Sequence, residues 1–273
     1  MTVQSCHTSI EGHNVHYWEG GSGFPILMLH GVGPGTSIMG NFEPVLTPLT
    51  NRYHVFASDL IGFGQSDRKM HQPYFDVDLW VRQGLALLEL MPDGPCGVAG
   101  HSMGGALALK IAAASDRITH VLASSTVGTS YPITSALDRF WCLPQTRDEL
   151  CEIMSDMVAD PSKVTDQMIE DRWDLLMQDG YSDYFYKMFE PPRQTYLDAG
   201  RVTDSEFNIL NHREVNIAMI HGDADKPCPH DLTTARLSLS LPNARVLLIE
   251  DCGHNLPREN ADAYLSTATN LFG

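Results

Sequence analysis

Residues 96–114 read CGVAGHSMGGALALKIAAA, and this stretch decides the fold. The apolar run CGVA predicts a short buried strand, and MGGALALKIAAA predicts a helix that starts directly after it. Between them, residues 100–104 (GHSMG) fit the pattern G-x-S-x-G, in which glycines let a strand turn sharply into a helix. Such a turn exposes the serine hydroxyl at the carboxyl edge of a sheet. Ser102 is therefore a candidate nucleophile, and an ordinary Gly-Ser-Gly loop is the alternative.

Short apolar runs alternate with helical patterns along the chain. This alternation is typical of an α/β protein with a mostly parallel sheet and helices on both faces. Because the apolar runs are continuous, we expect them to be buried on both faces of that sheet. Helices are expected at residues 76–90 and 103–114. The expected strands are residues 24–30, 54–58, 96–99, 121–123, 215–220 and 245–249.

The pattern changes at residue 129, where strand signals stop and amphipathic helical segments begin. The strand pattern resumes at Val215. We therefore predict a core domain formed by residues 1–128 and 206–273, with residues 129–205 inserted as a helical cap. The cap holds 15 acidic and 7 basic residues, so recognition of an anion there must depend on a particular buried arginine rather than on the overall field.

Composition limits the possible partners. The 273 residues include 34 acidic and 18 basic side chains, which gives a formal charge of −16 and excludes nucleic acid as an expected partner. With 43% hydrophobic and 19% charged residues, the chain can form a substantial core. No run approaches the roughly 18 apolar residues of a membrane span, and the amino terminus does not resemble a leader. We expect no membrane association and a cytoplasmic location.

Metal binding is not indicated by the sequence. The six cysteines include no C-x-x-C pair, which argues against a disulfide framework and a cysteine-based zinc site. His13 and His16 lie three residues apart, but no further ligand is close in the sequence. We expect no metal and no organic cofactor.

A serine nucleophile requires a base and an orienting carboxylate, which should follow it along the chain on loops after later strands. His254 follows the expected strand 245–249 and is the candidate base. Asp223 and Asp225 follow the strand 215–220, and Asp251 precedes the histidine. These three aspartates are the candidates for the acid.

Acyl transfer also needs donors for the oxygen that becomes negative. The backbone N–H of Met103 is one candidate, because this residue opens the helix after the nucleophile. The second donor should come from the glycine-rich turn HGVGPG at residues 30–35, with Val32 as the first choice. Phosphate binding by this turn is the alternative, but its spacing fits neither GxxxxGK[ST] nor GxGxxG.

Together these segments resemble the α/β-hydrolase superfamily, which implies the α/β-hydrolase fold with a helical cap. The segment HGVGPGTSIMGNF, residues 30–42, is similar to the HGxGPG…NF segment of meta-cleavage product hydrolases, which cleave a C–C bond in 2-hydroxy-6-oxo-dienoates from aromatic degradation. The segment DLIGFGQSDR, residues 59–68, is also similar to that family. The resemblance implies Ser102, Asp225 and His254 as triad, with Val32 and Met103 as oxyanion donors.

The same resemblance implies that Asn41 and Arg172 bind the polar end of a dienoate. The alternatives are that Asn41 caps the chain before Phe42 and that Arg172 pairs with Glu170 or Asp174. The chain departs from the family at His101, where members often have Asn, and at Asn255, where they often have Trp; both positions border the expected site. A small-molecule substrate is implied, and a carboxylesterase or lactonase with the same triad is the alternative function. A non-catalytic binding protein is a third possibility, and a homodimer is the default assembly.

Overall fold

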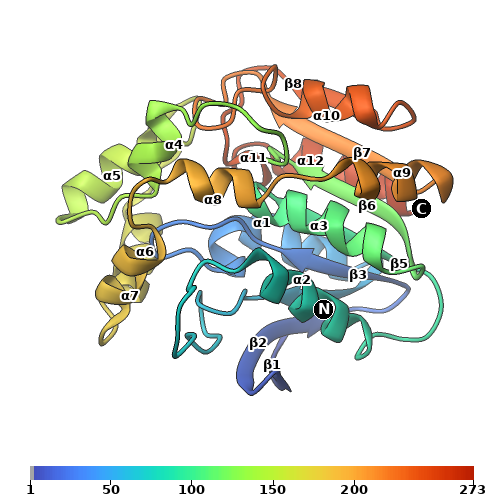
Figure 1. Cartoon of the computed structure of the whole chain (residues 1–273), viewed down its shortest axis with the longest axis horizontal. Coiled ribbons are helices and arrows are strands. Elements are labelled where there is room, and N and C mark those ends of the chain that lie inside the picture. Colours follow the sequence, from blue (N-terminus) through green and yellow to red (C-terminus); the bar gives the residue numbers. More distant parts are fainter. Residues whose placement is uncertain (1–2) are drawn as a thin grey trace.

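The computed structural model describes residues 3–273, which form an eight-stranded sheet with the strand order β1-β2-β4-β3-β5-β6-β7-β8. From β4 to β8 the neighbouring strands run parallel, and β1 and β2 run antiparallel to their neighbours. Figure 1 shows the sheet at the centre of the molecule. The strands are β1 (Gln4–Ile10), β2 (His13–Gly20), β3 (Phe24–Leu29), β4 (Tyr53–Ser58), β5 (Cys96–His101), β6 (Ile118–Ser124), β7 (Asn216–Gly222) and β8 (Arg245–Ile249).

All six predicted strands are present, but the hairpin of β1 and β2 was not predicted. β1 is mostly exposed or half-buried, and β2 has three buried residues in a row, Val15, His16 and Tyr17, but polar residues interrupt both strands, so neither forms a continuous apolar run. The turn between them contains Glu11 and Gly12, which both have positive φ angles. β1 is an edge strand with many exposed side chains, so its sequence lacks the signal of a strand buried on both faces.

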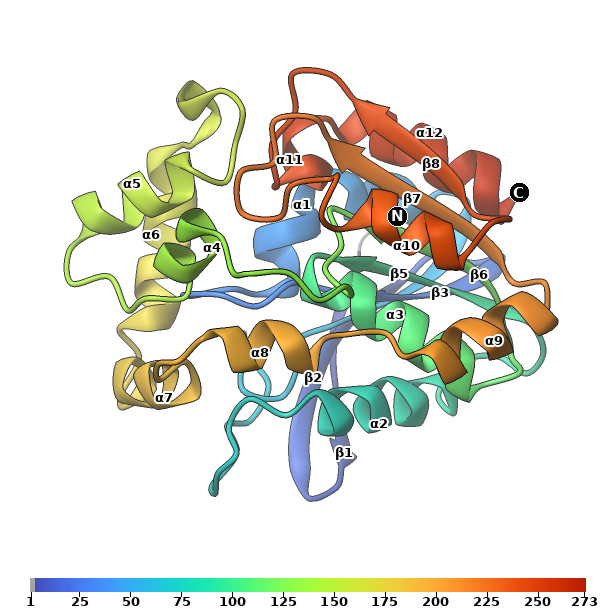
Figure 2. The same ribbon diagram turned by 45° about the horizontal axis from the view of Figure 1, so that its top comes forward.

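Helices cover both faces of the sheet, as the sequence predicts. On one face, α1, α11 and α12 pack against one another, and α1 and α12 contact the sheet. On the other face, α2 and α3 contact the sheet and each other, and α9 packs against α3. Figure 2 shows the two layers on either side of the strands. The bounds of these helices, and of α10, which contacts β8, are α1 (Ile38–Thr50), α2 (Val77–Leu88), α3 (Met103–Ala114), α9 (Asp204–His212), α10 (Thr234–Ser240), α11 (Leu256–Glu259) and α12 (Ala261–Phe272).

The chain between β6 and β7 is helical, and it contributes the group of helices at the left of Figure 1. The last helix of this stretch, α9, packs against α3, and Lys110 of α3 forms an ion pair with Glu206. The division at residues 129 and 206 remains a prediction. The other helices are α4 (Ser135–Phe140), α5 (Arg147–Ser155), α6 (Asp166–Leu176), α7 (Tyr181–Met188) and α8 (Gln194–Ala199).

The expected burial on both faces is wrong for β8. Val246, Leu247 and Leu248 are 41%, 37% and 46% exposed. The reason is position, because β8 is the last strand of the sheet and pairs with β7 alone. A run of apolar residues identifies a strand, but it does not reveal whether the strand lies at the sheet edge.

The helices of residues 3–273 are short. The longest, α1, has 13 residues, whereas about 20 are needed to cross a bilayer. No helix in this range is both long enough and apolar enough to span a membrane.

Candidate active site

Ser102 occupies the sharp turn that the sequence predicts. It stands between β5 and α3 with φ 55° and ψ −119°, a left-handed conformation that is costly for a residue with a side chain. Its N–H donates to the carbonyl of Ser124 on β6 at 2.9 Å, and its carbonyl accepts from the N–H of Gly105 at 3.0 Å. These hydrogen bonds hold the strained turn in place and present the hydroxyl beyond the sheet.

The two glycines that flank the serine are required by close backbone approach. A Cβ at Gly100 would lie 2.0 Å from the carbonyl oxygen of Gly104. A Cβ at Gly104 would lie 2.3 Å from the carbonyl oxygen of Leu29, on the neighbouring strand. The G-x-S-x-G spacing therefore reflects contact between the turn, the helix and β3.

Three distant segments meet at this turn. The Nε2 atom of His254 lies 3.0 Å from Oγ of Ser102, and its Nδ1 atom lies 2.8 Å from Oδ2 of Asp225. All three side chains are buried. Of the candidate acids, Asp223 and Asp251 are exposed, and Asp223 accepts a long hydrogen bond from the N–H of Cys252. Only Asp225 of these three contacts the imidazole.

Two further groups hold the carboxylate of Asp225. The N–H of Cys228 donates to Oδ1 at 2.7 Å, and Nε2 of His221 lies 3.0 Å from Oδ2. Burial would raise the pKa of this carboxyl, but His254 and His221 outweigh burial and hold the pKa well below its ordinary value. Asp225 is therefore ionised. The sequence patterns did not identify His221 as a partner of the acid, although it is the next-to-last residue of β7, the strand that leads to Asp225.

The pKa values of the two histidines beside the nucleophile, His254 and His101, are shifted in opposite directions. Burial would lower the pKa of His254, but the adjacent carboxylate of Asp225 raises it well above 6.5. For His101, burial and the charge of His254 lower the pKa well below 6.5. His101 is thus neutral, and its Nδ1 lies 3.2 Å from Oγ of Ser124.

The predicted oxyanion donors lie beside Ser102. The N–H groups of Val32 and Met103 make no hydrogen bond to another group within residues 3–273. The indole of Trp141 donates to the carbonyl of Val32 at 3.0 Å and so fixes the peptide plane between Val32 and Gly33. Trp141 follows α4, between β6 and β7, and no sequence pattern indicated this contact.

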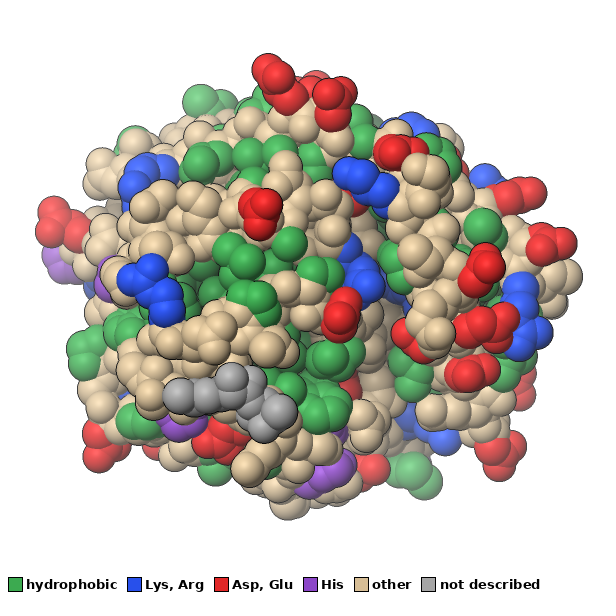
Figure 3. Space-filling view, turned by 180° about the vertical axis from the view of Figure 1, so that it is seen from behind, with side chains coloured by type: hydrophobic (Ala, Val, Ile, Leu, Met, Phe, Trp, Pro, Cys, Tyr) green, Lys and Arg blue, Asp and Glu red, His purple; other side chains and the backbone are tan. Residues whose placement is uncertain are grey.

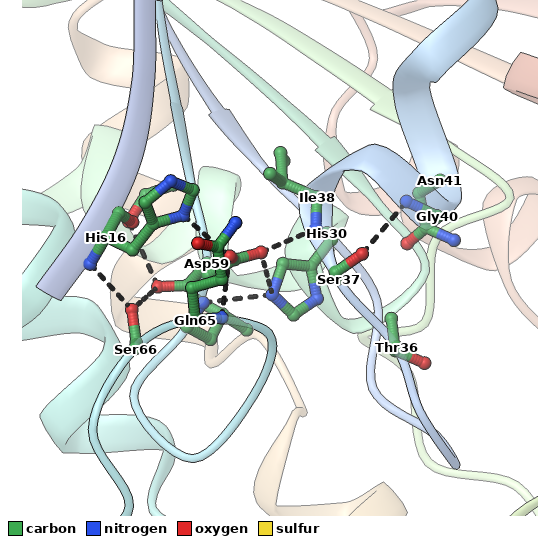
Figure 4. Close-up of polar contacts among 12 residues, drawn as sticks. His16, His30, Thr36, Ser37, Ile38, Gly40, Asn41, Asp59, Gln65 and Ser66 are labelled. Carbon is green, nitrogen blue, oxygen red and sulfur yellow. Dashed lines mark hydrogen bonds and ion pairs between the residues drawn. The ribbon is translucent and has the colours of Figure 1, made fainter. Parts of the chain in front are cut away.

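A buried polar network around Asp59 supports the loop that carries Val32, as Figure 4 shows. Asp59 accepts from the N–H of Ile38 at 2.7 Å and from that of Gln65 at 3.0 Å, and it lies 2.8 Å from Nδ1 of His16. His30 lies 2.5 Å from the carbonyl of Gly31 through Nδ1 and accepts from the N–H of Leu60 through Nε2. The network ties both ends of the loop to β2 and β4.

Asn41 also helps to hold the loop that carries Val32. Its Oδ1 accepts from the N–H of Gly31 at 2.9 Å, which fixes the glycine before Val32. Within the described chain its amide nitrogen has no hydrogen-bond partner, and the residue lines the catalytic pocket. Asn41 thus caps the loop and also presents a donor to the pocket.

Arg172 is buried without a carboxylate partner among residues 3–273. It is 5% exposed, and its Nη1 donates to the carbonyl of Pro34 at 2.9 Å and to Oγ1 of Thr36 at 3.0 Å. The alternative, in which Arg172 forms a surface ion pair, is wrong. Arg172 is buried, and Glu170 pairs with Arg147 instead. Burial lowers the pKa of Arg172 to about 10, so the guanidinium is still charged at neutral pH.

Asn255 is also buried, and its Nδ2 atom has no hydrogen-bond partner among the described residues. A buried amide nitrogen without an acceptor costs roughly 1–3 kcal/mol, so such groups usually serve a ligand or water. Asn255 and His101 both line the catalytic pocket. The two positions at which the sequence departs from the meta-cleavage pattern therefore border the site.

All the favoured candidate residues except Asp225 and Met103 line one pocket. Phe140, Met154 and Met157, from the chain between β6 and β7, also line it. The pocket volume is about 10 Å³, close to the minimum for one water molecule. A substrate therefore requires these side chains to move. The lining residues are Gly31, Val32, Thr36, Asn41, His101, Ser102, Phe140, Met154, Met157, Arg172, His254 and Asn255.

One set of potential metal ligands overlaps the site. Asp225, Cys228 and His254 offer ligand atoms within 4.8 Å of one another. Asp225 and His254 are already hydrogen-bonded to each other, and burial raises the pKa of the Cys228 thiol. Because a metal binds the thiolate rather than the thiol, the set is a poor metal site as it stands.

Comparisons with known proteins agree with this geometry. The sequence model of the Alpha/beta hydrolase family matches residues 26–267. The chain is 29% identical to a 2-hydroxymuconate semialdehyde hydrolase of Pseudomonas sp. (strain CF600), over 93% of this chain and 87% of that protein. It is 28% identical to a 2-hydroxy-6-oxo-2,4-heptadienoate hydrolase of Pseudomonas putida, over 86% and 83% of the two chains.

A solved structure is also similar. The meta-cleavage product hydrolase of Pseudomonas fluorescens IP01 superposes with a TM-score of 0.86 at 26% identity, over 95% of this chain and 94% of that one. Since the family match covers most of the sequence, the chain belongs to the alpha/beta hydrolase family. The predicted fold is confirmed, and the protein is a hydrolase.

The close approach at Gly104 yields a prediction about stability. Gly104→Ala should lower the free energy of unfolding by about 1–3 kcal/mol, because its Cβ forces the turn away from β3. Gly40→Ala is the control, since its Cβ would meet Oγ of Ser37 at 3.4 Å, an ordinary contact. Urea unfolding measures both. Equal midpoints for the two variants would contradict the packing argument.

The electrostatics of His254 predict the pH dependence of ester hydrolysis. The neutral imidazole is the base, so kcat/KM should rise with pH and reach half its plateau above 6.5, because Asp225 raises the pKa of His254. Asp225→Asn should move this midpoint to lower pH and reduce the plateau by about 10⁴-fold. An unchanged midpoint in the variant would show that Asp225 does not set the pKa.

Proposed function

We propose that the enzyme cleaves a C–C bond in a 2-hydroxy-6-oxo-dienoate. The observation that carries this proposal is Arg172, a buried cation without a carboxylate partner among the described residues, beside Ser102 in one pocket. A buried charge is costly unless it is paired, so the site favours a ligand that supplies a carboxylate. The printed names of the relatives describe hydrolases of substrates of this kind.

In the proposed reaction Ser102, Asp225 and His254 act as the triad. The substrate first moves its 2-hydroxyl proton to C5, giving a 2,6-dioxo form. Oγ of Ser102 then attacks the 6-oxo carbon while His254 takes the hydroxyl proton, and the N–H groups of Val32 and Met103 hold the oxyanion.

Collapse of the tetrahedral intermediate breaks the bond between C5 and C6. The electron pair stays on C5, where conjugation with the 2-oxo group stabilises it, and His254 returns its proton to this fragment. The remaining acyl group is an ester of Ser102. Water, activated by His254, hydrolyses this ester to a carboxylic acid and frees the serine.

The polar end of the substrate would meet several donors. Arg172 takes the carboxylate, and the amide nitrogens of Asn41 and Asn255 supply donors without other partners in the described chain. His101, held neutral by burial, offers a ring nitrogen that can donate or accept without adding charge. The apolar side chains Met154 and Met157 also line the pocket.

The test compares two substrate classes on the purified enzyme. A coloured dienoate ring-fission product reports C–C cleavage by loss of absorbance, and a neutral p-nitrophenyl ester reports acyl transfer alone. We expect kcat/KM for the dienoate to be the larger by at least about tenfold. Efficient ester hydrolysis without bleaching of the dienoate would assign the enzyme to the carboxylesterases or lactonases instead.

Arg172 provides a second test of the same proposal. Arg172→Ala should reduce kcat/KM for the dienoate by roughly 10- to 100-fold, which corresponds to the loss of a charge-assisted hydrogen bond of about 1.5–3 kcal/mol. The neutral ester has no carboxylate, so its kcat/KM should fall much less. Equal losses for both substrates would mean that Arg172 only supports the loop through Pro34 and Thr36.

A further inference from the structure

A hollow much larger than the catalytic pocket lies outside it. It has a volume of about 590 Å³ and opens between α1 and α6. Figure 3, viewed from behind, shows a hollow between the cap helices on the right and the core on the left, with a basic side chain inside it. Arg172 lines both this groove and the catalytic pocket, so the two adjoin at this residue.

A second arginine, Arg258, lines the same groove. It belongs to α11, four residues after His254, and its side chain is 20% exposed. Its guanidinium donates to the carbonyl of Met39 and to a carboxylate oxygen of Glu43, each at 3.3 Å. The charge of Arg258 contributes to the lowered pKa of Arg172, which means that the two cations act on one another.

The groove also contains acidic groups, and these lie farther out. Glu43, Asp171 and Asp174 line it and are exposed, whereas Arg172 is buried and Arg258 is half-buried. The chain as a whole carries a formal charge of −16, so its overall field repels an anion. An anionic substrate that approaches through this groove needs a local cation to offset that field.

The groove has the size and lining of a binding site. Its volume falls within the roughly 300–1,000 Å³ of typical small-molecule sites, while the catalytic pocket of about 10 Å³ has no room for a dienoate. Met39, Met168 and Leu175 supply apolar surface beside the two arginines. The groove thus offers both parts that a small organic anion requires, a cation and an apolar wall.

We propose that this groove is an outer binding site for carboxylate-bearing substrates, in which Arg258 holds the carboxylate before it passes to Arg172. Glu43 competes with the substrate for Arg258 and thereby weakens this outer site. The inference rests on the proposed function for its natural ligand, a dienoate. Its chemistry concerns any small organic carboxylate, so it can be tested without a dienoate.

The test uses two p-nitrophenyl esters of similar size, one with a terminal carboxylate and one neutral. The measured quantity is the ratio of their kcat/KM values, anionic over neutral, at low ionic strength. Arg258→Gln should lower this ratio by about three- to tenfold, and Glu43→Gln should raise it by a similar factor, because it releases Arg258 and removes a negative charge. Both shifts should shrink at about 1 M salt, where exposed charges are screened within about 3 Å.

Arg245→Gln is the matched control. This arginine lies on the edge strand β8, where it contacts the carbonyl of Asn270, so its loss should leave the ratio unchanged. The proposal requires opposite shifts for the two groove variants, and any other pattern overturns it. If Arg258→Gln does not fold, Glu43→Gln alone decides the matter, and an unchanged ratio contradicts the outer site.

These outcomes are separable from those of the proposed function. A protein that leaves the dienoate intact but shows the opposite shifts with the ester pair would retain the outer carboxylate site and lose the C–C assignment. A protein that bleaches the dienoate with no shift in either groove variant would retain the assignment and lose the outer site. If the protein hydrolyses the dienoate, kcat/KM for the dienoate should change in the same direction as kcat/KM for the anionic ester in both variants.

Discussion

The hydrogen bond between Ser102 and His254 is the interaction on which the rest of the site depends. It joins residues 152 positions apart and exists because two separate loops end at the same edge of the sheet. The left-handed turn at Ser102 fixes one partner, and Asp225 with its own two supports fixes the other. Strain in the turn is tolerated because Gly100 and Gly104 allow β5, α3 and β3 to pack closely.

Charge around this hydrogen bond is distributed unevenly. The protein is strongly acidic, yet the catalytic pocket contains the buried Arg172. It also contains the amide nitrogens of Asn41 and Asn255, which have no hydrogen-bond partner among the described residues. Arg172 gives the pocket a local preference for an anion that the overall field does not provide. The closed pocket further implies that binding is coupled to movement of Phe140, Met154 and Met157, which come from the helices between β6 and β7.

Local patterns predicted the parts of the structure that depend on neighbouring residues. The helix at residues 103–114 and the strand at residues 245–249 have the predicted bounds, because G-x-S-x-G and a continuous apolar run are local signals. Long-range contacts could not be predicted in this way. Nothing in the sequence indicated that Trp141 orients Val32, that Asp59 supports the loop, or that β8 lies at an exposed edge. The choice of Asp225 over two nearby aspartates came from a family resemblance, and the geometry now gives its physical reason.

The most direct test of the central claim is to locate the covalent intermediate. A fluorophosphonate reacts irreversibly with an activated serine, and mass spectrometry of the digested protein identifies the modified residue. The account predicts one adduct per chain on Ser102, formed in parallel with loss of activity and greatly slowed in His254→Ala. Complete inactivation with the adduct on another residue, or rapid labelling of Ser102 without His254, would contradict it.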